Sequence, residues 1–181
     1  MEIDIVKDEA DKKEKRAAMK KLAGYLSEPF PPFDIEWRVQ RAGAKNGKPW
    51  AQVLAYVTNR AIMQRLDDVC GIDNWKNEYT DIPNGVECKL LIRLHGEWIG
   101  KCDAAQNTDI ESVKGGRSGA MKRAAVQWGI GRYLYNLEHT FADITDSGRF
   151  WQKGKQGQYE SFNWNPPALP EWALPNKRDE S

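Results

Sequence analysis

Two stretches of the chain alternate apolar and polar residues as β-strands do. They are residues 35–40 and 51–57, and the sequence AGAKNGKP at 42–49 between them is rich in turn-forming residues. The pattern predicts an antiparallel hairpin joined by a loop. Arg41 stands directly beside that loop.

A second hairpin is predicted in the sequence VECKLLIRLHGEWIGKCDAAQ, where apolar residues occupy alternate positions. A three-residue loop ending at Gly96 lets the even positions of both strands share one face. The apolar face of the returning strand then consists of Trp98, Gly100, Cys102 and Ala104. The same register pairs Cys88 with Cys102, and Lys89 with Lys101.

Cations on the polar face of this hairpin allow two interpretations. Like charges directly opposite each other are mildly destabilising, so Lys89, Lys101 and nearby Arg93 are explained if this face meets phosphate. Alternatively, acidic residues on the same face neutralise them. The sequence leaves both interpretations open.

Helical spacing of apolar residues predicts three helices. The first covers residues 8–27 and ends before a cluster of prolines, and the second begins at Thr58 or Asn59 and stops at Gly71. The third is a long helix within residues 112–137, where alanines and glycines leave one side with little bulk. Strand hairpins together with helices indicate an α+β fold.

The distribution of charge is more informative than its sum, because the formal net charge is only +1. Residues 61–111 hold ten acidic and five basic residues, whereas residues 112–137 hold five basic and no acidic ones. This separation of basic from acidic segments predicts a positively charged groove, suited to a polyanion, on a surface that otherwise carries both signs of charge. Trp128 and two tyrosines of the same run could stack on bases, although aromatics on such a helix more often belong to the core.

Three cysteines without CxxC spacing favour reduced thiols over a disulfide framework. The N-terminus lacks the apolar segment of a signal peptide, and no apolar run approaches the ~20 residues of a membrane helix. We therefore expect a cytoplasmic protein with no membrane partner.

No catalytic motif is present, so the sequence predicts a protein that is not an enzyme, with no catalytic residue, no metal site and no cofactor. It lacks HExxH, a Walker loop and a G-x-S-x-G elbow. A metal-dependent nuclease stays a less favoured alternative, which requires the fold to gather the aspartates 67, 68, 81, 103 and 109.

Five segments, taken in order, resemble one known family. They are the turn VQRAGAKNGK, the strand QVLAYV, the sequence GIDNW, the hairpin, and the helix AMKRAAVQWGIGRYLY. This succession over about residues 35–145 resembles the core of the Rad52-type single-strand annealing proteins, particularly the phage Sak-like and DdrA-like branch. The Lys-Arg pair followed by Gly-x-Gly is its most specific element.

The resemblance implies a β-β-α-β-β-β-α core, with a curved antiparallel sheet packed on a long C-terminal helix. It divides the chain into an N-terminal helix and Pro-rich linker at 1–33, an annealing core at 34–147, and an aromatic, Pro-rich arm at 148–181. The arm is expected to pack on its own core or on the next subunit. A docking peptide or a base-stacking platform around Lys153 and Lys155 are the alternatives.

The resemblance also implies ATP-independent binding and annealing of single-stranded DNA in recombination and repair. Expected partners are single-stranded DNA, further copies of the chain in a ring or spiral, and recombination proteins of a phage or its bacterial host. Lys122 and Arg123 are expected to line the DNA groove, with Arg41 across it. A generic RNA- or DNA-binding module without annealing activity remains the main alternative. The full set of candidate DNA-binding residues is Arg41, Lys45, Lys48, Lys89, Arg93, Lys101, Lys114, Arg117, Lys122, Arg123 and Arg132.

Overall fold

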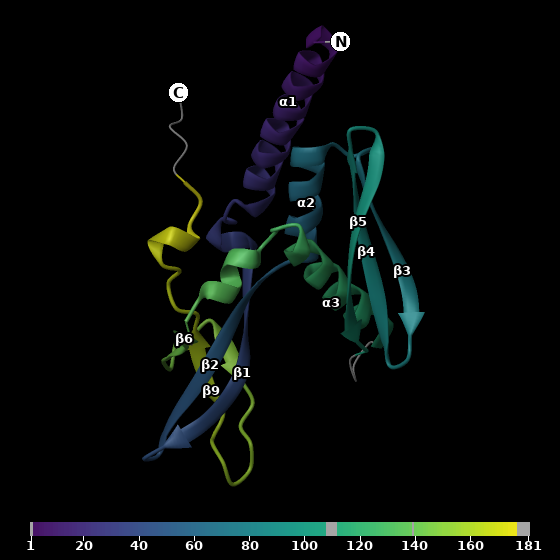
Figure 1. Ribbon diagram of the computed structural model, residues 1–181. Helices are drawn as coiled ribbons and strands as arrows, with labels where there is room; N and C mark the ends of the chain where they lie inside the picture. Colours follow the sequence, from purple (N-terminus) through teal and green to yellow (C-terminus); the bar gives the residue numbers. More distant parts are fainter. Residues whose placement is uncertain (1, 108–111, 139, 177–181) are drawn as a thin grey trace. The chain divides into compact units, whose positions relative to one another are not determined.

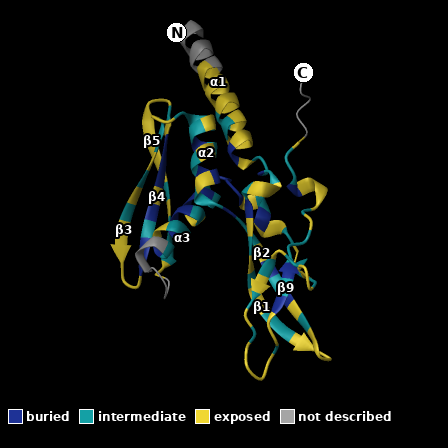
Figure 2. Cartoon of the chain, turned by 180° about the vertical axis from the view of Figure 1, so that it is seen from behind, coloured by how far each residue is buried: buried dark blue, intermediate teal, exposed yellow. Residues whose placement is uncertain are grey.

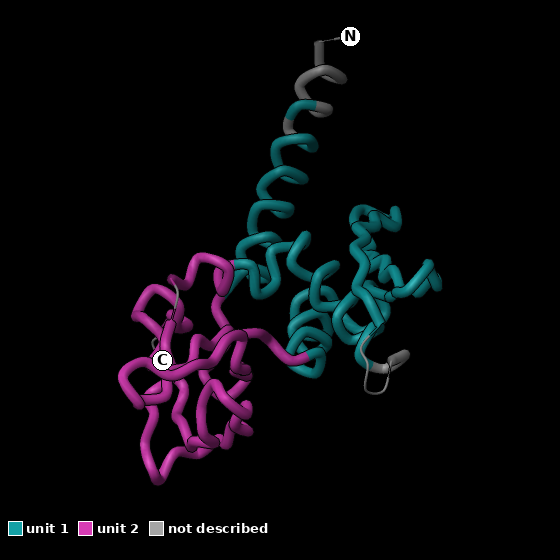
Figure 3. Tube along the Cα trace, turned by 90° about the horizontal axis from the view of Figure 1, so that it is seen from below, with its two compact units in different colours: residues 1–28, 59–132 teal, residues 29–58, 133–181 magenta. Residues whose placement is uncertain are grey.

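The computed structural model describes residues 2–107, 112–138 and 140–176, which form an α+β fold (Figure 1). Its strands form three antiparallel sheets, ordered β1-β2-β6, β3-β4-β5 and β7-β9-β8. The chain divides into two compact units, each assembled from two separate segments (Figure 3). Unit 1 holds residues 1–28 and 59–132, and unit 2 holds residues 29–58 and 133–181.

Unit 1 is a three-stranded sheet with a helix on one face and two further helices. Its elements are α1 (Glu2–Ser27), α2 (Asn59–Cys70), β3 (Trp75–Ile82), β4 (Gly85–Leu94), β5 (Glu97–Gln106) and α3 (Ser112–Gln127). Figure 2 shows buried residues along β4, the central strand. Leu90 and Ile92 of β4 lie on the face that α3 covers. Ala120, Ala124 and Ala125 of α3 are fully buried. The low bulk of α3 lets the helix approach the sheet closely, as predicted: a Cβ on Gly119 would lie 3.0 Å from that of Ala105.

The C-terminal end of α1 packs on α2, whereas residues 11–18, earlier in the helix, are exposed. The Arg65 guanidinium donates hydrogen bonds to the carbonyls of Tyr25 (3.0 Å) and Glu28 (2.8 Å). These carbonyls lie at the end of the helix, where the backbone offers no further donors. Leu26 packs below them with 1% of its surface exposed.

The predicted register of the second hairpin is wrong by one residue. The turn contains two residues, His95 and Gly96, and both have positive φ angles, 51° and 87°. Such a turn matches the twist of a hairpin and pairs Leu94 with Glu97. Lys89 therefore lies opposite Cys102, and the other predicted pairs shift as well: Cys88 faces Asp103, and Leu90 faces Lys101.

The shifted register exchanges the two faces of β5. Its odd positions, including Lys101 and Asp103, share the face of β4 that α3 covers. Trp98, Gly100, Cys102 and Ala104, predicted to form the apolar face, instead accompany Lys89 and Arg93 on the other side of the sheet.

The long C-terminal helix is not confirmed, because α3 ends at Gln127. Gly129 and Gly131 have φ angles of 97° and 68°, which are incompatible with a continuing right-handed helix. A short 3₁₀ segment, η2 (Arg132–Asn136), follows. Trp128 belongs to the core, as the sequence favoured: it is 9% exposed, and its indole N–H donates to the carbonyl of Leu90 at 3.0 Å.

Unit 2 is built on a long hairpin, β1 (Ile35–Lys45) and β2 (Lys48–Val57). The predicted loop at 42–49 is almost entirely strand, since only Asn46 and Gly47, with φ of 53° and 74°, form the turn. The remaining elements are η1 (Pro32–Asp34), β6 (Thr140–Phe141), β7 (Asp143–Ile144), β8 (Phe150–Gln152), β9 (Phe162–Asn165) and η3 (Glu171–Ala173).

One face of this hairpin is covered by the C-terminal segment of the chain. Phe162 and Trp164 of β9 are 7% and 3% exposed and pack with Ala51 and Val53 of β2. Phe150 stacks on Trp164 at 4.9 Å between ring centroids. Aromatic residues after position 148 thus supply half of a core whose other half lies more than a hundred residues earlier.

Candidate nucleic-acid interface

A β-bulge determines where the Arg41 side chain points. Val39 pairs with Val53 and Arg41 with the next residue back, Gln52, so that Gln40 is an extra residue in β1. If Val39, Gln40 and Arg41 alternated regularly without a bulge, Arg41 would lie on the same face as Val39, toward the core. The bulge turns Arg41 to the uncovered face of the hairpin, where Arg38 also lies.

This uncovered face of β1 and β2 concentrates positive charge. Arg38, Arg41, Lys45 and Lys48 are all exposed, and Lys45 stands directly opposite Lys48. In the part of the chain that the structure describes, no ion pair joins Arg41, Lys45 or Lys48 to a carboxylate. Three cations without a partner make a surface to which an anion gains access without breaking an existing bond.

The carboxylate on the same face is already engaged. Glu36 lies across the strands from Tyr56 and hydrogen-bonds its hydroxyl. Partial burial, and then this bond and the charge of Glu36, raise the pKa of Tyr56, while Arg38 opposes the shift. Glu36 stands at the opposite end of the hairpin from Lys45 and Lys48.

Two aromatic residues on this face escaped the sequence analysis. Trp50 faces Gly43, and Phe141 of β6 pairs with Gln52, the neighbour of Arg41. Their rings meet edge to face, with centroids 6.2 Å apart. The signal that could have revealed Trp50 was the Asn-Gly turn at 46–47, which extends both strands and sets Trp50 outward.

Three cations of unit 1 contact the protein's own backbone or aromatic rings. The Arg132 guanidinium donates to the carbonyls of Val126 (2.8 Å) and Gln127 (2.7 Å), at the end of α3. Lys101 donates to the same Gln127 carbonyl at 2.8 Å and lies 4.5 Å from the ring centre of Trp128. Arg117 stands 5.3 Å from the ring centre of Tyr79.

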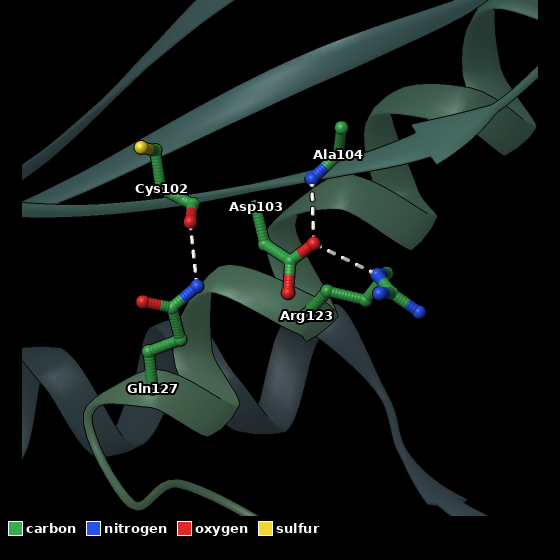
Figure 4. Close-up of polar contacts among 5 residues, drawn as sticks. All are labelled: Cys102, Asp103, Ala104, Arg123 and Gln127. Atoms are coloured by element: carbon green, nitrogen blue, oxygen red, sulfur yellow. Dashed lines mark hydrogen bonds and ion pairs between the residues drawn. The ribbon is translucent and has the colours of Figure 1, made fainter.

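Arg123 forms an ion pair with Asp103 of β5 at 3.0 Å (Figure 4). Partial burial raises the pKa of Asp103, but the Ala104 N–H and the Arg123 guanidinium outweigh it, so the net pKa is lowered. The Arg123 side chain remains 56% exposed, so the pair adds little stability. Lys122 is half-buried beside it, and the side chain of Lys114 lies outside the described residues.

Lys89 and Arg93 are exposed on the sheet face opposite α3, in a surface of mixed charge. Lys76 of β3 pairs with Glu78 at 2.9 Å and lies 5.1 Å from the ring centre of Trp98. The Glu78 pKa is lowered first by Lys76 and also by Lys89. Acids neutralise this face in part, which was the second interpretation of the hairpin.

The structure thus sorts the candidate residues into three groups. One is the cationic face of the unit 2 hairpin, with Arg41, Lys45 and Lys48. A second lies on α3 and around its end in unit 1, and a third is the mixed face of β3-β4-β5. Within the described ranges, no three His, Cys, Asp or Glu residues gather as metal ligands would. No helix there is long and apolar enough to cross a membrane.

The exposed face of arginine, lysine and aromatic residues on this α+β protein is similar in its surface chemistry to those of polyanion-binding proteins. A model of the Rad52/22 family of double-strand break repair proteins matches residues 18–149. The chain belongs to this family, which confirms the resemblance seen in the sequence.

Two curated relatives carry the name single-stranded DNA-binding protein DdrA. The protein of Deinococcus radiodurans is 34% identical over 157 residues, which cover 83% of this chain and 66% of the relative. The protein of Deinococcus deserti is 33% identical over 156 residues, which cover 83% and 69%. The chain therefore spans about two thirds of the length of these relatives.

Proposed function

We propose that this chain binds single-stranded DNA and promotes the annealing of complementary strands in recombination and repair. Family membership and the name of the DdrA relatives support the ligand. The observation that carries the proposal is the hairpin face on which Arg41, Lys45 and Lys48 are exposed and form no ion pair with any carboxylate that the structure describes.

Annealing follows from how such a surface holds a strand. Arginine and lysine bind phosphates through charge-assisted hydrogen bonds and release condensed counterions, which favours association without hydrolysis of a nucleotide. Phosphate contacts carry no sequence information, so the bases stay available to a complementary strand. We therefore propose that the protein works without ATP.

We assign the cations of unit 1 different weights in this function. Lys122 and Arg123 are proposed to contact the strand, with a phosphate replacing the exposed Asp103 pair of Arg123. Lys101 and Arg132 are proposed to position α3, because their donors already serve helix carbonyls. Lys89, Arg93, Lys114 and Arg117 are proposed as weaker contributors of positive charge.

Double substitutions of neighbouring cations test whether the hairpin face binds the strand. Lys45→Gln/Lys48→Gln should weaken binding to a dT oligomer, and the slope of log K against log salt should fall by about 1.4, since each lost contact removes about 0.7 on a single strand. Lys12→Gln/Lys13→Gln, in the exposed part of α1, is the control and should change neither quantity. Lys122→Gln/Arg123→Gln should also weaken binding more than the control. Equal effects of all three pairs would overturn the assignment.

Annealing, oligomerisation and the alternatives are distinguished by four measurements. Complementary strands should anneal faster with the protein present and ATP absent, and electron micrographs should show rings or spirals. Equal affinity for dT oligomers, RNA and duplex at two salt concentrations, without annealing, would favour the generic binding module. Magnesium-dependent cleavage of the same oligonucleotides would favour the nuclease.

A further inference from the structure

Trp50 and Phe141 form an exposed aromatic pair on the cationic face of the hairpin. Trp50 is 36% exposed and Phe141 57% exposed, although both lie on strands whose other face is buried. The Trp50 ring covers Gly43 so closely that a Cβ added there would lie 2.8 Å from it. A backbone without a side chain at position 43 is therefore required for this ring position.

Contacts on β6 hold the second ring in place. The Ala142 N–H donates to the Ala51 carbonyl at 2.9 Å, and the Thr140 hydroxyl donates to the Val53 carbonyl at 3.2 Å. Phe141, between them, points to the uncovered face, opposite Gln52. The pair is thus two partly exposed rings that lie on paired strands.

The cations around this pair indicate what chemistry it accepts. Arg41 lies in the pairing row of Gln52 and Phe141, and Lys45 and Lys48 lie at the end of the strands that carry Gly43 and Trp50. An apolar protein partner would leave these cations without an anion. An unpaired nucleotide supplies both a planar base for the rings and a phosphate for the cations.

We propose that Trp50 and Phe141 are a stacking platform for unpaired bases and that they make this surface prefer single strands to duplex. The inference rests on the proposed function. Duplex DNA exposes its phosphates but hides the faces of its bases in its own stack. Cations alone therefore cannot discriminate the two forms, whereas an aromatic platform can.

Abasic oligonucleotides separate stacking from phosphate binding. We expect wild-type protein to bind a dT oligomer more tightly than an abasic strand of equal length. Phe141→Leu and Trp50→Leu should each lose about tenfold in affinity for the dT oligomer, in line with base–aromatic stacking elsewhere. Neither should change affinity for the abasic strand or for duplex.

Phe33→Leu is the matched control, because Phe33 is 85% exposed in the same unit and follows prolines rather than cations. It should leave all three affinities unchanged. Trp50→Phe should retain most of the affinity for the dT oligomer. Phe141→Leu decides the question even if Trp50→Leu disturbs the fold, which circular dichroism would detect.

The outcomes separate the two proposals. If wild-type protein binds neither the dT nor the abasic strand, the proposed function itself fails. If it binds both equally, or if Phe141→Leu weakens both by the same factor, single-strand binding stands and the stacking platform is refuted.

Discussion

At the scale of single residues, an arginine that looks suited to bind a phosphate can instead bind backbone carbonyls of its own chain. Arg132 follows the last turn of α3, and its guanidinium donates to the carbonyls of Val126 and Gln127 there; the Val126 carbonyl also accepts the Gly129 N–H at 3.0 Å. The sequence places it among DNA-binding candidates because the run has no acid. What the sequence does not show is that Gly129 and Gly131 end the helix and bring Arg132 back onto it.

Tyr79, which is half-buried, and Cys88, which is fully buried, form a pair whose ionisation opposes folding. They lie opposite each other on β3 and β4, and burial, followed by their mutual contact, raises the pKa of Tyr79 to about 12. Burial likewise raises the pKa of Cys88 to about 11. The folded state therefore keeps protons that the unfolded chain has already released above about pH 9.

The stability of unit 1 should thus be fully present below about pH 9 and decline as the pH rises toward 11 and 12. Urea unfolding midpoints between pH 8 and 11 would measure this decline. The double variant Tyr79→Phe/Cys88→Ala should start less stable and decline less. An unchanged slope in that variant would show that other groups cause the pH dependence.

At the scale of elements, the bulge at Gln40 decides which side of β1 is positive. Deleting Gln40 would remove the extra residue, and strict alternation would then keep Arg41 on the uncovered face, opposite Gln52, with Val39 still opposite Val53. We expect the free energy of unfolding to change by no more than about 1 kcal/mol, because the deletion moves no charge into the core. Thermal or denaturant unfolding would measure it.

Gln40→Ala is the control for this deletion, since it keeps the extra residue and changes only an exposed side chain. Its effect should stay within about 0.5 kcal/mol. A loss of about 3 kcal/mol or more in the deletion variant alone would contradict this register, because it would mean that the deletion turns Arg41 toward the core.

The sequence was enough to predict where helices and strands occur, but not the register in which β4 and β5 pair. Helical spacing located α2 between Asn59 and Gly71 because a buried face of Ile62 and Leu66 repeats along it. The faces of β5 depended on whether His95 and Gly96 made a two- or three-residue turn, which alternation alone does not decide. One residue of difference moved Lys101 and Asp103 beneath α3.

The candidate site shows the same division. Composition and the family resemblance pointed to the Lys-Arg pair of α3 and to Arg41. Ion pairing and helix capping, which depend on contacts far apart in sequence, could not be foreseen for Arg123 or Arg132. The aromatic pair of Trp50 and Phe141 was hidden for the same reason, because β6 joins β2 only in the fold.

At the scale of the whole molecule, unit 2 depends on the C-terminal segment for its core. A chain that ends at Ser147 would lose Phe162 and Trp164 and uncover Ala51 and Val53. Loss of buried aromatic side chains typically costs about 3–5 kcal/mol each, so the β1-β2 hairpin should lose its protection. Unit 1 has its own buried residues and should remain folded.

Limited proteolysis with mass spectrometry would test this truncation, with cleavage expected in residues 35–57 but not in 75–106. A chain that ends at Asn176 is the control, since it keeps Phe162 and Trp164, and should resist cleavage as the full chain does. Protection of the hairpin in the shorter chain would contradict the dependence.

The interleaving of the two units also sets an order of events on the ribosome. Unit 1 can be completed once Arg132 has emerged, but the hairpin must wait from Val53 until Phe162 is made. At about 5–20 residues per second, that interval is roughly 5–20 s. During it, the nascent chain exposes the apolar face of the β1-β2 hairpin while unit 1 is already complete, so the early hairpin is the segment that most needs a chaperone during synthesis.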